Sequence, residues 1–438
     1  MAKSIVIIGA GAAGLQAGRR LSAAGFRVIL LEAAAEPGGR IRTLTPKSFS
    51  TPAEGGAEFI HGELPLSLGL MKEAGIVLQP VNAVMVRRPG GGDVAASDAG
   101  PAGSAAGPDA EGVMGADWGA LMEAMAGLTE DLPIAEFLAT HFGGERYAQL
   151  RQSVRRFAEG YDLADMDRAS TMALYKEWSG EEGEEEWRPV GGYGRMIDFL
   201  AAECRREGAE LYCSTPVSEV SWEKGHIAVT TDRGQVFVAD TIIVSISLGV
   251  LAMGGLRFVP ELPQLDEAVK QLGFGSVIKI LLEFKRAFWL DGKPEGRTLF
   301  VLSDQAAPTW WTQTGEENCL LTGWLAGDRM RRFQQLDETA RLESCLQSVA
   351  AIFSVDLEGV RGELEASMIL DWSEEPFVRG GYSFETVEAA RARTILGQAF
   401  GGTLYFCGEA LYEGAAPGTV EAALQSGWDV AERVIARL

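Results

Sequence analysis

The chain has 438 residues, of which 47% are hydrophobic and 23% charged, a balance typical of a soluble globular protein with a sizeable core. Its length predicts two domains. Its formal net charge of -22 argues against binding to nucleic acid or to an anionic membrane, because both attract clustered lysine and arginine.

The chain opens with a predicted strand, a glycine-rich turn and a helix. Residues 3–8 are a β-branched run, the turn reads GAGAAG, and a helical pattern follows at 15–24. In this order Gly9 permits the tight turn, Gly11 lets the backbone approach a pyrophosphate, and Gly14 lets the helix pack on the strand. The phosphates would then face the N-terminus of the helix.

A second predicted strand, at residues 27–31, ends in Glu32. This position is close to the offset of about 20 residues at which an acidic side chain accepts the ribose hydroxyls of a dinucleotide. The opening segment therefore predicts a dinucleotide-binding βαβ unit, with FAD and NAD both open at this point.

The middle of the chain changes character. Residues 89–115 are rich in Gly, Ala, Pro, Ser and Asp without periodicity, which predicts a flexible loop. Apolar residues at spacings of three and four then predict a helical cap, with helices at 118–128, 133–142 and 146–157. The glutamate-rich run at 180–186 is typical of an exposed loop.

Predicted strands return after this cap. They lie at residues 210–212, 217–222, 227–231, 235–239 and 241–246. The nucleotide-binding domain therefore resumes after an insertion and is discontinuous in sequence.

A later predicted strand, SVIKILLEF at 276–284, carries an isolated lysine. Alternate residues of this strand form one apolar face, and Lys279 lies on the other. Either Lys279 points into solvent beside Glu283 and Lys285, or it stands inside the protein for a chemical reason. Spacing alone leaves both interpretations open.

The last predicted element is an amphipathic helix that starts right after Pro417 and Gly418. Its N-terminus would carry unpaired backbone N–H groups and a partial positive charge.

The cysteines and the hydrophobic runs exclude several classes of protein. Five widely spaced cysteines without a CxxC pair argue against a disulfide framework and against a zinc site. The apolar run at 5–8 is too short for a signal peptide, and no run approaches the roughly 18 apolar residues of a membrane span. We therefore expect a cytoplasmic protein with no bound metal and no membrane contact.

Three short segments carry a resemblance to a known family. They read EPGGRIR at 36–42, GGAEFIHG at 55–62 and LYFCGE at 404–409. Together they resemble the flavin-containing amine oxidases, which include monoamine and polyamine oxidases and the related histone lysine demethylases. The resemblance runs in order from Ile5 to Val434 and is weakest between Val84 and Ser179.

The resemblance implies an α/β fold, in which a discontinuous Rossmann-like FAD-binding domain carries an inserted α+β substrate-binding domain. The FAD-binding domain would comprise residues 1–75, 196–280 and 372–438, and the substrate-binding domain residues 76–195 and 281–371. FAD would be bound noncovalently, because Gly381 stands where monoamine oxidases carry the cysteine that bonds to the flavin.

The resemblance also implies the residues of the site. Lys279 would be catalytic, by binding a water that contacts flavin N5. Tyr382 would be one wall of an aromatic cage around the amine, and Thr419 stands where the second cage aromatic is expected. The other substrate contacts would be His61, Trp372 and Glu58. The contacts to FAD would be Gly9, Gly11, Ala13, Gly14, Glu32, Gly39, Arg40, Gly56, Ala57, Glu58, Phe59, Val217, Trp372, Gly408, Glu409, Thr419 and Val420.

The activity that the resemblance implies is FAD-dependent oxidation of an amine to an imine. A hydride equivalent would pass to flavin N5, water would hydrolyse the imine, and O2 would reoxidise the flavin and give hydrogen peroxide. The incomplete cage favours the polyamine oxidase and demethylase side of the family, so a polyamine or another small amine is the expected substrate. The oligomeric state stays open.

Three alternatives remain at this point. An L-amino acid oxidase would need an arginine for the substrate carboxylate, which the sequence does not place. A desaturase of the carotenoid or protoporphyrinogen kind would lack the lysine at position 279. A scaffold or binding protein would hold FAD without turning over any amine.

Overall fold

The computed structural model describes residues 3–45, 49–81, 83–88, 117–180, 185–290, 298–313 and 318–437. The predicted flexible loop at 89–115 lies outside these residues.

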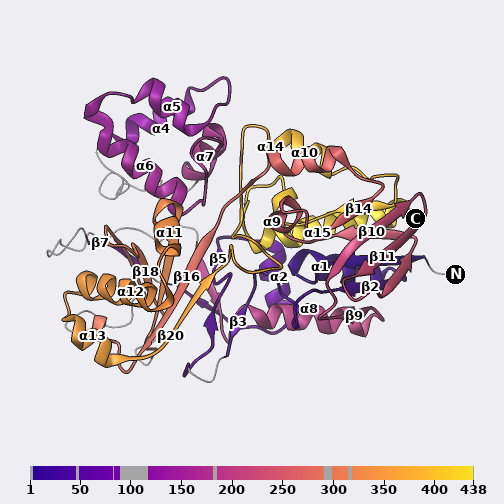
Figure 1. Cartoon of the computed structure of the whole chain (residues 1–438), viewed down its shortest axis with the longest axis horizontal. Coiled ribbons are helices and arrows are strands. Elements are labelled where there is room, and N and C mark those ends of the chain that lie inside the picture. The colour runs from indigo at the N-terminus through magenta and orange to yellow at the C-terminus, as the bar shows by residue number, and fades with distance from the viewer. Residues whose placement is uncertain are drawn as a thin grey trace.

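A five-stranded parallel sheet is assembled from stretches far apart in the chain (Figure 1). Its order is β22-β13-β1-β2-β9, with β1 (Ser4–Ile8), β2 (Arg27–Leu31), β9 (Glu210–Tyr212), β13 (Thr241–Val244) and β22 (Leu404–Phe406). Every neighbouring pair is parallel, so Ile7 lies between Leu30 and Ile243. The prediction that the nucleotide-binding domain resumes late in the chain is confirmed.

Helices cover one face of this sheet. Alternate residues of β1 and β2 form one core with α1 (Ala12–Ala23), α8 (Gly194–Arg206) and α15 (Val420–Arg437), and α2 (Pro65–Glu73) packs against α15. Gly427 brings α15 against α1, because a Cβ there would lie 2.2 Å from the carbonyl oxygen of Ala13. Helix α1 begins at Ala12, earlier than the predicted residue 15, because the glycine turn leads directly into it.

The remaining residues of β1 and β2 pack on the other face in a second core. A four-stranded sheet of order β12-β11-β10-β14 joins this core, with β10 (Val217–Glu223), β11 (His226–Thr231), β12 (Val236–Ala239) and β14 (Arg257–Val259). Helices α9 (Leu248–Ala252), α10 (Pro263–Gln271) and α14 (Ala389–Leu396) complete it.

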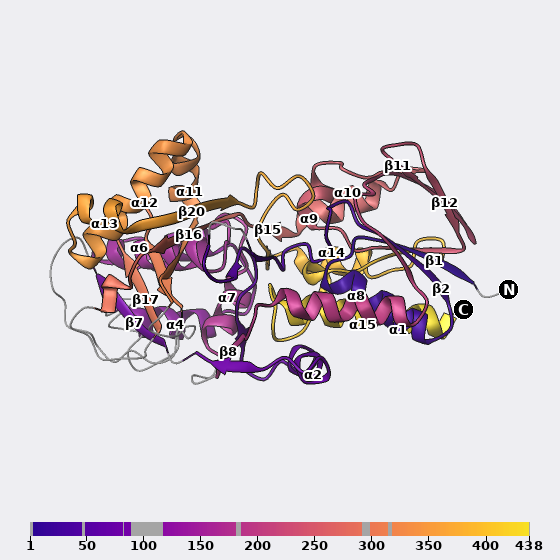
Figure 2. The ribbon, with the colours of Figure 1, turned by 90° about the horizontal axis from the view of Figure 1, so that it is seen from below.

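A six-stranded sheet forms the opposite half of the molecule (Figure 2). Its order is β20-β16-β19-β18-β17-β7, with β7 (Ala83–Arg88), β16 (Val277–Phe284), β17 (Thr298–Ser303), β18 (Thr309–Thr312), β19 (Leu320–Ala326) and β20 (Leu364–Asp371). Helices α11 (Gly327–Gln334), α12 (Glu338–Phe353) and α13 (Leu357–Glu363) pack on it. In both views the two termini lie at the end of the molecule away from this sheet.

The predicted helical cap is confirmed as a separate lobe beside the six-stranded sheet (Figure 1). Its helices are α4 (Trp118–Ala126), α5 (Ile134–His141), α6 (Ala148–Gly160) and α7 (Thr171–Trp178). Small sheets join the parts: β3 (Thr43–Leu44) with β4 (Ala53–Glu54), β5 (Ile60–His61) with β8 (Glu186–Pro189) and β6 (Leu78–Pro80), and β15 (Gly273–Phe274) with β21 (Ser383–Phe384). Short 3-10 helices lie at Glu145–Tyr147, Phe288–Leu290 and Glu409–Leu411.

The domain division stays a prediction, although two of its boundaries fall inside elements. The boundary at 195/196 lies within α8, and the boundary at 280/281 lies within β16. Strand β16 belongs entirely to the six-stranded sheet, which places Lys279 in the half predicted to bind substrate.

Candidate functional site

One cavity of about 3590 Å³ runs between the parallel sheet, the six-stranded sheet and the helical cap. All of the residues that the sequence predicts for the site line it except Gly14. Gly14 instead serves packing, since a Cβ there would lie 2.1 Å from the carbonyl oxygen of Gly9.

The start of α1 forms a cradle at one end of the cavity. Gly9 adopts a positive φ of 99°, and the chain turns directly into α1 at Ala12. Gly11 stands at the N-cap and has no side chain, and no side chain of the described residues takes its place as a cap. The first N–H groups of α1 are therefore available to an anion, as a pyrophosphate requires.

Glu32 lies at the end of β2 and faces this cradle. Its carboxylate accepts hydrogen bonds from the backbone N–H groups of Ala10 and Ala34, each at 2.8 Å. Burial raises the pKa of Glu32, and these hydrogen bonds lower it in part. A carboxylate has about four acceptor positions, so Glu32 keeps capacity for the hydroxyls of a ribose. Val217, at the start of β10, lines the same end of the cavity.

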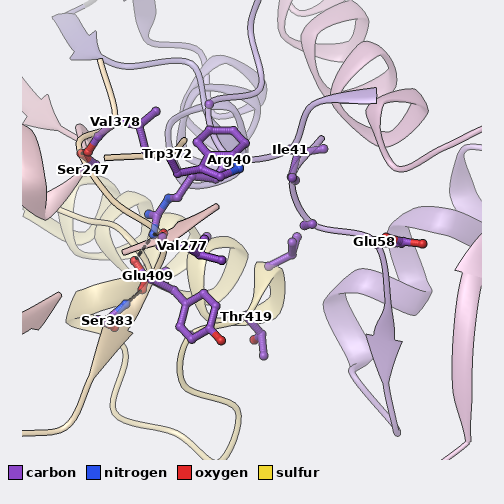
Figure 3. A pocket seen from close by; sticks show the side chains of 18 of the residues that line it. Arg40, Ile41, Glu58, Ser247, Val277, Trp372, Val378, Ser383, Glu409 and Thr419 are labelled. Carbon is purple, nitrogen blue, oxygen red and sulfur yellow. Dashed lines mark hydrogen bonds and ion pairs between the residues drawn. The ribbon is translucent and has the colours of Figure 1, made fainter. Parts of the chain in front are cut away.

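Arg40 and Glu409 join two glycine turns over the middle of the cavity (Figure 3). Arg40 Nη1 lies 2.8 Å from Glu409 Oε2 and donates to the carbonyl of Gly381 at 2.9 Å. Glu409 Oε1 accepts from the backbone N–H of Ser383. The carboxylate of Glu409 is thus held by the chain itself, and its predicted contact with the cofactor stays a prediction.

Other predicted cofactor residues lie along the same wall. Gly56 approaches Arg40 so closely that a Cβ would lie 1.9 Å from the carbonyl oxygen of Arg40. Thr419 caps α15, because its Oγ1 accepts from the N–H of Ala422 at 3.2 Å. The remaining members of the wall are Ala13, Gly39, Ala57, Phe59, Gly408 and Val420.

Lys279 points into the protein, which decides between the two interpretations of its strand. Every residue of β16 is buried, and Lys279 is 1% exposed. Its Nζ donates to Glu58 Oε2 at 2.7 Å and to the carbonyl of Gly56 at 2.9 Å, and it lies 5.4 Å from the ring centroid of Trp311. An ammonium has three N–H donors, so one remains for a water or the cofactor.

Glu58 is the buried counter-ion of two cations. Besides Lys279, it lies 2.8 Å from Arg188 Nη2 and accepts from Trp311 Nε1 at 3.1 Å and Gln313 Nε2 at 3.0 Å. Burial acts to raise the pKa of Glu58, but the attraction of Lys279 and Arg188 outweighs it and lowers this pKa to about 2. These four neighbours already use all of the acceptor positions of Glu58, so its predicted contacts with substrate and FAD stay predictions.

A row of aromatic side chains forms the wall next to Lys279. Tyr382 stacks on Trp324 with ring centroids 6.2 Å apart, and Trp324 lies 6.2 Å from Trp311. The wall beside Tyr382 thus has further aromatic members, from β18 and β19, and the predicted cage around an amine stays a prediction. Sequence reasoning missed both tryptophans, because only the pairing of these strands brings them beside Tyr382.

The turn after α6 is fastened to this wall. Trp324 Nε1 donates to the carbonyl of Gly160 at 2.8 Å, and the hydroxyl of Tyr382 donates to the carbonyl of Tyr161. Leu163 then fills the space beside Gly381, where a Cβ would lie 2.6 Å from its Cδ1. A side chain at position 381 would require this end of Leu163 to shift, and the noncovalent binding of FAD stays a prediction.

Trp372 is buried under the cavity wall, with 3% exposure. Its Nε1 donates to the carbonyl of Gly55 at 2.9 Å, and the guanidinium of Arg42 lies 4.7 Å from its ring centroid.

His61 lies at the rim of the cavity, where its side chain is 40% exposed. Its Nδ1 lies 3.0 Å from Glu186 Oε1. The expected exposed loop at 180–186 is wrong for Glu186, which is 6% exposed in β8 because β8 pairs with β5 and sets Glu186 opposite His61. Residues 181–184 of that run lie outside the described residues.

Other chemistries find no support in the described part of the chain. It contains no group of three or more side chains arranged to hold a metal ion. All five cysteines are free. None of the described helices is both long enough and apolar enough to cross a membrane.

Comparisons with known proteins agree with this geometry. A family model described as flavin containing amine oxidoreductase matches residues 12–435. Lysine-specific histone demethylase 1B of Mus musculus is 25% identical over 99% of this chain and 53% of its own length. Lysine-specific histone demethylase 1 homolog 3 of Oryza sativa subsp. japonica is 28% identical over 97% of this chain and 53% of its own length. The chain thus spans about half the length of these relatives.

Solved structures share the whole fold. Putrescine oxidase bound to putrescine matches with a TM-score of 0.80 and 18% identity, covering 100% of both chains. Cyclohexylamine oxidase from Brevibacterium oxydans IH-35A matches with a TM-score of 0.79 and 18% identity, covering 100% of this chain and 99% of its own.

Proposed function

Because the chain belongs to the flavin-containing amine oxidoreductases, we propose that it is an FAD-dependent oxidase of small amines, a polyamine among them. One observation carries this proposal: a single cavity joins the dinucleotide cradle to a buried lysine and an aromatic wall. When bound, FAD would supply the oxidation of the C–N bond to an imine and pass the electrons to O2, with hydrogen peroxide as the product.

The residues of the chain fit this cofactor at both ends. The uncapped N-terminus of α1 and the carboxylate of Glu32 would hold the pyrophosphate and ribose. Lys279, held in place by Glu58 at 2.7 Å, would hold a water with its remaining N–H group. The ion pair with Glu58 explains why a buried lysine is tolerated in an apolar strand.

The aromatic wall would position the amine. The flat faces of Trp311, Trp324 and Tyr382 exclude water and favour the neutral form of an amine over its cation inside a dry pocket. They also restrict how the C–H bond next to nitrogen can be aimed. Neither task requires a strong base on the chain.

An amine that carries a carboxylate is the second candidate, because arginines line the cavity on α6 and α11. Arg329 Nη1 donates to the carbonyl of Gln305 at 2.6 Å, and Arg156 Nη1 lies 2.8 Å from Asp304. Burial lowers the pKa of Arg329, and the neighbouring Arg156 and Arg332 lower it further. An anionic group would relieve this repulsion, so an amino acid oxidase remains the alternative to test.

Anaerobic flavin bleaching tests the proposal. The purified holoprotein is mixed with monoamines, polyamines, methylated lysine peptides and amino acids while the flavin absorption band is followed. We expect polyamines or other small amines to bleach it, whereas bleaching by amino acids alone, weakened in Arg329→Met, would favour the second candidate. A flavin that dithionite reduces but no member of the panel bleaches would refute both and favour a scaffold protein. The cytoplasmic location and the absence of nucleic-acid and membrane partners stay predictions.

A further inference from the structure

Three arginines gather where the cap meets the six-stranded sheet, and the oxidation step uses none of them. Arg156 lies on α6, and Arg329 and Arg332 lie on α11. Helix α11 contacts α6 of the cap as well as β16 and β19 of the sheet (Figure 1). All three arginines line the cavity that also holds Lys279 and the aromatic wall. Such a cluster is unexpected in this chain, which has 39 lysine and arginine residues against 61 acidic ones.

The end of α6 and the start of α11 are held close together. Gly327 begins α11 with a positive φ of 61°, and a Cβ there would lie 2.8 Å from Oε2 of Glu159. Arg329 Nη1 then donates to the carbonyl of Gln305, in the turn between β17 and β18, at 2.6 Å. This bond uses one of the five N–H groups of the guanidinium and fixes the others at the cavity wall.

The carboxylates next to the cluster are already paired with other guanidinium groups. The pairs are Arg156 with Asp304 at 2.8 Å, Arg155 with Glu159 at 2.6 Å and Arg331 with Asp328. Within the described part of the chain, neither Arg329 nor Arg332 forms an ion pair. Burial, then Arg156, lowers the pKa of Arg329, while Asp304 raises it and Arg332 lowers it further. Because arginine keeps its charge in proteins, this part of the cavity has an excess of positive charge that an anion would offset.

The cluster lies next to the aromatic wall but away from the predicted flavin contacts. Trp324 donates to the carbonyl of Gly160, and Arg156 stands one helical turn before Gly160, about 6 Å along the axis of α6. Arg329 follows Trp324 in the chain, just after the junction of β19 and α11. None of the residues predicted to contact FAD belongs to α6 or α11. An anionic group held by the cluster would therefore lie beyond the wall, several bonds from the carbon that is oxidised.

We propose that Arg329, with Arg156 and Arg332, binds an anionic group at the end of the substrate opposite to its amine. This inference rests on the proposed function and adds a preference within it, for small amines that carry a distal carboxylate or phosphate. The fork of N–H groups of a guanidinium matches both anions. The α-carboxylate of an ordinary amino acid would not reach the cluster while its amine lies at the wall, so this site differs from the one that an L-amino acid oxidase requires. The same excess of positive charge repels the second ammonium group of a diamine.

The test compares ω-aminoalkanoates and ω-aminoalkyl phosphates with n-alkylamines of the same chain length on the holoprotein. Anaerobic flavin bleaching gives an apparent Kd for each amine. At the best chain length, the preferred anionic amine should bind about tenfold to a hundredfold more tightly than the alkylamine, as expected for hydrogen bonds between charged groups. The anion with the larger advantage, carboxylate or phosphate, is the one that the site recognises.

Arginine variants locate the site. In Arg329→Met the advantage should fall to about twofold or less, while the Kd of an α,ω-diaminoalkane should decrease, because a repelling charge is removed. A purely structural loss would instead weaken the binding of both. Arg332→Met, which removes an exposed side chain, should reduce the advantage by up to about fivefold. Arg331→Met removes the same charge from the same helix outside the cavity lining, and this matched control should keep the advantage.

Binding of glutarate, which has no amine to oxidise, gives a readout that is independent of turnover. Calorimetry of the holoprotein should show that glutarate competes with the ω-aminoalkanoate and binds at least about tenfold more weakly to Arg329→Met, but not to Arg331→Met. Equal Kd values for anionic amine and alkylamine, or equal losses in Arg329→Met and Arg331→Met, would overturn the anion site alone. Binding of glutarate through Arg329 to a protein whose reducible flavin no amine bleaches would support the anion site and overturn the proposed function.

Discussion

Replacing Glu58 with glutamine should strongly destabilise the protein, because it removes the carboxylate that pairs with two buried cations. The substitution keeps the shape of the side chain but takes its charge from Lys279 and Arg188, at 2.7 and 2.8 Å. The fall of the Glu58 pKa from 4.5 to about 2 corresponds to about 3 kcal/mol in favour of the charged form. Breaking a buried ion pair typically costs about 3–5 kcal/mol, so we expect a loss of about 3 kcal/mol.

Guanidinium unfolding in excess FAD measures this loss. Because the pKa of Glu58 is lower in the folded than in the unfolded protein, its charge contributes fully to the free energy of unfolding above pH 4.5. This contribution disappears as the pH falls toward 2. The difference between the two proteins should therefore shrink in acid. Glu365→Gln is the control, because Glu365 of β20 forms an exposed ion pair with Lys285 at 3.9 Å. It should lower the free energy of unfolding by less than about 1 kcal/mol.

A double-mutant cycle with Lys279→Met tests the assignment to this pair. The double variant should be more stable than the sum of the two single losses predicts. Each single substitution leaves one buried charge without its partner, whereas the double variant removes both charges of the pair. A loss for Glu58→Gln no larger than that of the surface control, or a coupling energy near zero, would refute the account of Glu58 as the counter-ion of Lys279.

Four further outcomes follow from the site. Lys279→Met should retain FAD but slow flavin turnover, and unchanged rates of both flavin reduction and reoxidation in stopped-flow would contradict its catalytic role. Gly11→Ala should weaken FAD binding but leave the fold intact, because its Cβ would meet nothing closer than 3.8 Å. Gly14→Ala should also lower the Tm of the FAD-free protein, because its Cβ would lie 2.1 Å from a carbonyl oxygen. Acid precipitation should release all flavin into the supernatant, because Gly381 offers no attachment atom, and yellow precipitate would show a covalent bond elsewhere. Burial raises the pKa of Glu54 to about 7, so stability should fall as the pH rises from 4.5 to 7, and Glu54→Gln should remove up to about 3 kcal/mol of that fall in denaturation curves.

The parallel sheet and its cradle were predictable because their signals are local. A β-branched run, three glycines and Glu32 stand within one βαβ unit, and their order alone indicates the cofactor site. The cap helices were predictable for the same reason, since apolar spacing within each helix specifies its buried face.

The substrate side was less predictable, because its residues meet through strand pairing and turns. Periodicity showed that Lys279 lies on the second face of β16 but not that this face is buried. The glutamate run looked solvated, yet pairing with β5 buries Glu186. Trp324 and Gly160 belong to different halves of the chain, and only the folded chain brings them within hydrogen-bond distance.

The order of the parallel sheet also has a consequence for how the protein is made. Strand β1 lies next to β13, and β13 lies next to β22, so the outer side of β13 has no partner strand until residues 404–406 leave the ribosome. At about 5–20 residues per second, the interval between β2 and β22 lasts roughly 20 to 80 seconds. Helix α15, whose Gly427 packs against Ala13 of α1, is synthesised later still. During synthesis the nascent nucleotide-binding unit therefore exposes the unpaired backbone groups of β13 and the apolar face of α1, both of which favour aggregation until the last elements arrive.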